Sequence, residues 1–141
     1  MSDPLRALDE APEDERGDLW TVRLIWFVRI MAGISLFKGL YHWIVLCGIG
    51  DGPYSFFEVA PMPWRSATVF FAVIDLVAAV GLWLAAAWGG VVWLTAAISM
   101  AAVEMLFPDI YGGRTWVILF ELTAIAIYLA LTVLSARERP D

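Results

Sequence analysis

Four long apolar stretches are the feature of this sequence that most constrains its fold. They cover residues 24–47, 66–86, 90–107 and 115–134. Each is close to the roughly 17–25 residues that a helix needs to cross a bilayer. The run 69–87 contains one charged residue, Asp75, and has no polar stripe at helical spacing, which argues against a water-soluble helical protein. The sequence therefore predicts an all-α protein, an integral membrane bundle of four transmembrane helices.

The composition supports a membrane protein made of one helical unit. Hydrophobic residues make up 61% of the 141 residues, against roughly 45–50% in soluble domains. We expect a single four-helix domain over residues 21–136, between an acidic, flexible tail at 1–20 and a short tail at 137–141. The net charge of −6 comes mainly from residues 1–18. This acidity argues against a nucleic-acid partner. The apolar composition makes the lipid bilayer the expected partner.

The arginines outside the apolar stretches predict the orientation. Arg16, Arg23, Arg137 and Arg139 lie near the two termini, whereas Arg65 and Arg114 lie at the opposite ends of the spans. Basic residues prefer the cytoplasmic side, so both termini are expected there, with the protein in a plasma membrane. Trp64 and Arg65 are then expected to contact lipid headgroups at the outer interface.

The connections differ in length. Residues 87–90, which include Gly89 and Gly90, predict a tight reversal between the second and third spans. The segment 48–64 is long and aromatic, which predicts a cover at the outer interface. A lid over a ligand site is the alternative for that segment.

Ionisable residues inside the spans are the candidate functional residues. The first span carries Arg29, Lys38 and His42, and the later spans carry Asp75, Glu104 and Glu121. Charges are costly in hydrocarbon, so we expect them to pair. At about 1.5 Å per residue, Lys38, Glu104 and Glu121 fall at one depth, with Asp75 within reach. The prediction is one lysine facing up to three carboxylates.

His42 and Arg29 have different expected places. His42 is one turn beyond Lys38 on the same face, where it could bond to Glu104 or Glu121. Arg29 is half a turn out of phase with Lys38, which predicts contact with headgroups or a partner protein.

Two interpretations of the Lys38 cluster remain open. Polar contacts can simply fix helix register, contributing roughly 0.6–2 kcal/mol each. The cluster could instead bind a proton or a ligand, because one lysine cannot neutralise three acids. A single histidine and the lone Cys47 predict no metal site, no haem and no disulfide. We also find no catalytic motif, and we predict no cofactor.

Two segments resemble known membrane proteins. The first span from Arg29 to Leu40, and the run from Asp75 to Leu84, resemble the first two helices of DoxX-like membrane proteins. The segments 37–43 and 61–65 more closely resemble an uncharacterised group of small bacterial inner-membrane proteins. These resemblances imply a four-span layout, and the DoxX likeness implies a link to quinone redox chemistry.

Three functional hypotheses follow. The first is a non-enzymatic accessory or interaction subunit in a bacterial inner (plasma) membrane, where it contacts a membrane-protein partner or a second copy of itself. The second is a proton-coupled transporter or binder of a small solute, using the Lys38 cluster. The third is a quinone-linked subunit in which Tyr41, His42 or Trp43 contacts the headgroup.

Overall fold

The computed structural model describes residues 19–50, 52 and 55–138. In chain order the helices are α3 Leu19–Leu46, α4 Phe56–Val59, α5 Met62–Trp83, α6 Ala87–Leu106, α7 Pro108–Tyr111 and α8 Thr115–Arg137. There is no strand in these described ranges, so the all-α prediction is confirmed. The helices α3, α5, α6 and α8 are each long and apolar enough to cross a membrane.

The helix boundaries differ from the apolar stretches at several ends. α3 begins at Leu19, inside the expected tail, and α5 begins four residues before the expected start. Residues 1–18 and 139–141, which hold most of the two predicted tails, lie outside the described residues. A helix can extend beyond its apolar stretch when the unpaired backbone N–H and C=O groups at its ends find hydrogen-bond partners.

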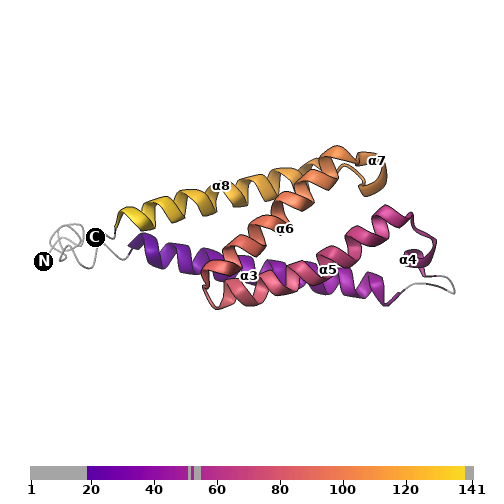
Figure 1. Cartoon of the computed structure of the whole chain (residues 1–141), viewed down its shortest axis with the longest axis horizontal. Coiled ribbons are helices and arrows are strands. Elements are labelled where there is room, and N and C mark those ends of the chain that lie inside the picture. Colours follow the sequence, from indigo (N-terminus) through magenta and orange to yellow (C-terminus); the bar gives the residue numbers. More distant parts are fainter. Residues whose placement is uncertain (1–18, 51, 53–54, 139–141) are drawn as a thin grey trace, which may run out of the picture.

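The four long helices form a closed ring of neighbours. α3 packs on α5, α5 on α6, α6 on α8, and α8 returns to α3. Figure 1 shows α3 beginning and α8 ending at the same end of the bundle, while α6 crosses between the α3–α5 pair and α8. At the opposite end α8 and α3 diverge (Figure 1).

A core of small residues and one large aromatic side chain holds the helices together. Ala72, Ala78 and Ala97 have no exposed surface, and Trp93 is 2% exposed. Phe27 of α3 and Tyr128 of α8 pack against Trp93. Small residues let helix backbones approach, which gives membrane helices most of their packing contact.

Glu138 joins the end of α8 to the first turn of α3. Its carboxylate accepts hydrogen bonds from the backbone N–H groups of Trp20 at 3.1 Å and Thr21 at 3.3 Å. The Thr21 and Ser135 hydroxyls are also 2.8 Å apart. A carboxylate at a helix N-terminus satisfies free N–H groups and favours the helix dipole, which explains why α3 begins before the apolar stretch.

The reversal between α5 and α6 lies earlier than the sequence predicts. It is made by Leu84, Ala85 and Ala86, and the predicted glycines already belong to α6. Gly89 instead packs against Gly81 of α5, where an added Cβ on Gly81 would lie 2.5 Å from the Gly89 Cα atom. These glycines are therefore required by close helix contact, and Ala85 makes the turn with φ of 51°.

Ala85→Gly should stabilise the protein. A non-glycine residue in the left-handed region costs roughly 1–2 kcal/mol, part of which is offset by the greater freedom of glycine in the unfolded chain. We expect a net gain of about 0.5–1 kcal/mol, measured as a higher melting temperature in detergent. Ala86→Gly, one residue later in extended backbone, is the matched control and should lower it. A lower melting temperature for Ala85→Gly would contradict the assigned turn.

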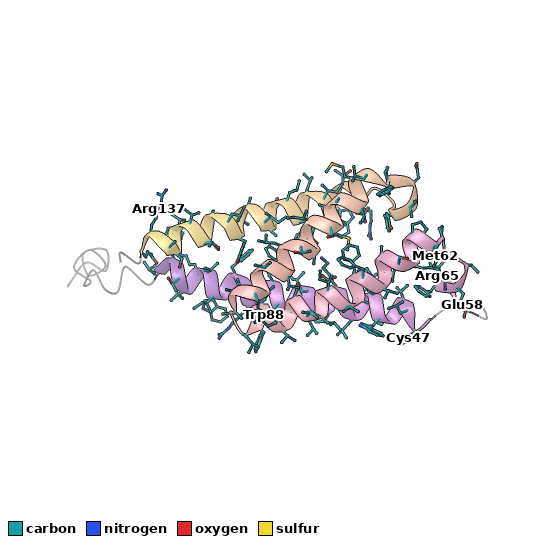
Figure 2. The ribbon with its side chains drawn as sticks, in the orientation of Figure 1. Cys47, Glu58, Met62, Arg65, Trp88 and Arg137 are labelled. Carbon is teal, nitrogen blue, oxygen red and sulfur yellow. The ribbon has the colours of Figure 1, made fainter. Side chains whose placement is uncertain are left out.

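The segment after α3 gathers aromatic side chains at one end of the bundle. Phe56 and Phe57 pack on Trp64, and the Arg65 guanidinium lies 5.1 Å from the Phe57 ring. The Tyr111 hydroxyl donates to the Pro63 carbonyl at 2.9 Å, which joins α7 to α5. Figure 2 places Met62 and Arg65 at this end, far from Arg137.

Candidate functional site

Three of the predicted residues meet between three helices. The Lys38 ammonium of α3 donates to Glu121 Oε1 of α8 at 2.6 Å and lies 3.8 Å from Asp75 Oδ1 of α5. Lys38 is about 12 Å before the end of α3 and Glu121 about 9 Å after the start of α8, so both lie at similar depth from one end. We call Lys38, Asp75 and Glu121 the charged layer.

Glu104 does not join this layer. Its Oε1 atom accepts from Nε and Nη2 of Arg114 at 3.0 and 2.7 Å, and its Oε2 atom accepts from the Arg114 backbone N–H at 2.9 Å. The expected contact between Lys38 and Glu104 is therefore wrong. Glu104 is near the end of α6 and Arg114 immediately precedes α8, so a short connection brings them together.

Arg114 is the residue that the sequence analysis missed. The sequence marks it only as an orientation signal at the membrane surface, and its side chain is half exposed. The signal for its pairing is local: an acid in the last turn of one helix and an arginine just before the next. Such a pair gives the buried Glu104 carboxylate a charged partner. The same carboxylate also accepts a hydrogen bond from a backbone N–H group at the start of α8.

The charged layer has more acid than base. Lys38 faces two carboxylates, whereas Glu104 and Arg114 balance each other. Asp75 is buried, and neither of its oxygens has a hydrogen-bond partner among the described residues. The Oε2 atom of Glu121 is buried and without a partner in the same way. A neutral layer would need one more positive charge or a proton on one acid.

One cavity adjoins the charged layer. It measures about 560 Å³ and lies between α3 and α8, whereas another cavity, of about 580 Å³ and lined in part by Thr21 and Ser135, is separate from the layer. We call the first of these the α3–α8 cavity. Its polar lining comes from Lys38 and Glu121, together with Tyr41, His42 and Arg114. A smaller cavity of about 250 Å³ shares Tyr41, His42 and Arg114 with the α3–α8 cavity and is also lined by Glu104.

His42 lies between these two cavities. Its ring stacks on Phe71 of α5 with centroids 5.8 Å apart. No hydrogen bond from His42 to Glu104 or Glu121 is found in the part of the chain that the structure describes. His42 therefore contributes to the lining of the site without joining the charged layer.

The remaining predicted residues lie away from the charged layer. The Arg29 guanidinium is 5.9 Å from the Trp83 ring, at the end of α5. Trp64 lines the smaller cavity, and Arg65 lines neither the smaller cavity nor the α3–α8 cavity. Among the described residues, no group of three or more His, Cys, Asp or Glu side chains could hold a metal ion.

Comparison with known proteins identifies a family without an assigned function. The model described as "Family of unknown function (DUF6163)" matches residues 22–139, so the chain belongs to this family. No curated protein and no solved structure matches the chain. The match agrees with the predicted membership of an uncharacterised family and gives no support to the DoxX-like resemblance or to a bacterial origin.

Proposed function

We propose that this DUF6163 protein is a multi-pass membrane protein that binds a small solute in the α3–α8 cavity and links that binding to a proton in the charged layer. The observation that carries the proposal is the shared use of one ammonium by two buried carboxylates. Both Asp75 oxygens have no hydrogen-bond partner among the described residues. Intramembrane ionisable groups of this kind commonly mark ion or substrate paths.

The membrane orientation is part of the proposal. The four apolar helices would span the bilayer, with Arg23 and Arg137 on the cytoplasmic side and Arg114 on the opposite side. The charged layer would then be closer to the outer surface, and the protein would reside in a plasma membrane.

Charge balance supports the link to a proton. Two carboxylates beside one ammonium leave a net negative charge, which is costly at this depth. A proton on Asp75 or Glu121 removes that charge. Because Lys38 also lines the α3–α8 cavity, a solute that binds its free N–H groups would weaken its attraction for the acids and favour proton uptake.

Infrared spectroscopy of protein in lipid nanodiscs tests the proton. A protonated carboxyl has a C=O stretching band that a carboxylate lacks, so the wild-type protein should show this band near neutral pH. Asp75→Asn or Glu121→Gln should remove or shift it, because the two acids share one ammonium.

Asp109→Asn is the matched control, because Asp109 is an exposed carboxylate on α7. It should leave the band unchanged. The proton link is rejected if the spectrum shows no buried protonated carboxyl at any pH between about 4 and 9. The upper part of this range is well above the pH at which ordinary carboxyl groups titrate.

The other two roles have weaker support. An accessory-subunit role depends on the exposed apolar faces of α3 and α8, which lipid would cover equally well. It stays a prediction, tested by identifying stoichiometric companions after purification in mild detergent. A quinone-linked role loses one of its expected contacts, because the Trp43 indole donates to the Ala72 carbonyl and lies outside the lining of both neighbouring cavities.

A further inference from the structure

We infer that the solute of the α3–α8 cavity is a single-chain amphiphile with one negative charge, such as a long-chain carboxylate, reached from the lipid phase. This inference rests on the proposed function, because it names the class of solute that the same cavity would take. Three observations carry it: the apolar lateral walls, the greater exposure of the cations than of the acids, and the cavity volume.

The side walls of the cavity are aromatic and face outward. Phe37 and Tyr41 of α3 are 74% and 60% exposed, and Trp116 and Phe120 of α8 are 68% and 41% exposed. In a bilayer such side chains would contact lipid tails. An apolar chain could therefore pass between α3 and α8 from the side, without crossing the aqueous phase.

The polar end of the cavity presents cations. The Lys38 and Arg114 side chains are 26% and 50% exposed, whereas those of Asp75, Glu104 and Glu121 are 1–2% exposed. Asp75 and Glu104 do not line the cavity, and Glu121 lines it with almost no exposed surface. The N–H donors of Lys38 and Arg114 are therefore more accessible to an incoming solute than the acids.

Both cations have donors to spare. An ammonium has three N–H groups, and Lys38 makes one hydrogen bond to Glu121. The Arg114 side chain uses Nε and Nη2 for Glu104, and its other terminal nitrogen has no hydrogen bond among the residues described. A carboxylate offers acceptors only, so its head group is complementary to these free donors.

Charge and size limit the solute further. Lys38 and Arg114 are already paired with acids, so each negative charge on the solute adds repulsion from Glu104 and Glu121, and a head with two charges would meet more of it than a head with one. The volume of about 560 Å³ is within the roughly 300–1,000 Å³ of small-molecule sites. A single chain fits that space better than a two-chain phospholipid.

Tryptophan quenching by brominated lipids tests the inference directly. Protein in phosphatidylcholine nanodiscs is titrated with dibromostearate, with its methyl ester, and with dibrominated phosphatidic acid. Bromine quenches tryptophan on contact, and Trp116 lines the cavity. The acid should give a saturable component at least about tenfold tighter than the ester, as expected for a charge-assisted hydrogen bond. That component should be missing in Trp116→Phe.

Two variants and two controls separate head-group binding from general lipid contact. Trp26→Phe removes an exposed tryptophan of α3 that does not line the cavity, and it should retain the saturable component. The double variant Glu104→Gln/Arg114→Gln removes one cation while keeping the buried pair neutral. It should lose about tenfold in affinity for the acid, whereas Arg65→Gln at the same end should not.

The outcomes are distinct. Equal quenching by the acid and by its methyl ester in the wild-type protein would overturn the inference. This comparison uses the wild-type protein alone, so it does not depend on whether a variant folds. Tighter quenching by phosphatidic acid than by dibromostearate would also overturn it, in favour of a two-chain lipid. Neither result affects the carboxyl band that tests the proton in the charged layer, so failure of the inference is separable from failure of the proposed function.

Discussion

Lys38→Met should destabilise the protein by about 3–5 kcal/mol, the usual cost of removing one partner of a buried ion pair. The substitution keeps a long apolar side chain in place and removes only the ammonium. Asp75 and Glu121 would then be buried together without a cation. Unfolding in mixed detergent micelles, followed by tryptophan fluorescence, measures the change in the free energy of unfolding.

The loss should depend on pH in a defined direction. Without Lys38, both acids must be protonated to remain buried without charge. The folded state of the variant therefore binds more protons than the unfolded state, so its stability should fall as pH rises. The wild-type protein should show a smaller fall over the same range, because the ammonium stabilises one of the two carboxylates.

Arg29→Met is the matched control for this substitution. Arg29 is on the same helix, but it is exposed and contacts the Trp83 ring. We expect a loss below about 1 kcal/mol, as is usual for exposed charges. The triple variant Lys38→Met/Asp75→Asn/Glu121→Gln should recover part of the lost stability. Equal losses for Lys38→Met and Arg29→Met would show that the charged layer does not stabilise the bundle.

The sequence predicts the long helices because hydropathy reports burial in lipid, which is a property of each segment alone. It predicts the meeting of Lys38 with Glu121 because depth along a helix follows from residue number. Rotation about the helix axis does not follow from residue number. Glu104 shares that depth but turns to Arg114, a partner ten residues away that is joined through the short turn at α7.

Two further differences between the structure and the sequence-based prediction depend on contacts between segments that are far apart in the chain. α3 begins at Leu19 because Glu138, from the far end of the described chain, accepts hydrogen bonds from its first turn. The signal for this cap is an acid just after the last helix, and nothing in the local sequence assigns it to α3. The glycines of 87–90 predict a turn from sequence alone, but glycine serves both turns and close packing, and here Gly89 serves packing.

Gly89→Ala should lower the free energy of unfolding by about 3 kcal/mol, at the upper end of typical overpacking costs. The new Cβ would overlap the Gly81 carbonyl group on α5, and backbone atoms of a helix cannot move aside as a side chain can. The same detergent unfolding experiment measures the loss. Gly89→Leu should prevent the α5–α6 pair from closing and give little folded protein.

Two other glycines make this prediction specific. At Gly90 an added Cβ would meet the hydroxyl of Tyr128, the end of a flexible side chain that can rotate, so Gly90→Ala should cost about 1 kcal/mol. At Gly33 nothing lies within 4 Å, and Gly33→Ala should stabilise α3 by up to about 1 kcal/mol through helix propensity. The order of stability should therefore be Gly33→Ala, wild type, Gly90→Ala and Gly89→Ala. If Gly89→Ala were as stable as Gly90→Ala, the α5 and α6 backbones would have to lie farther apart at Gly81 than this packing places them, since only a wider gap would leave room for the added methyl group.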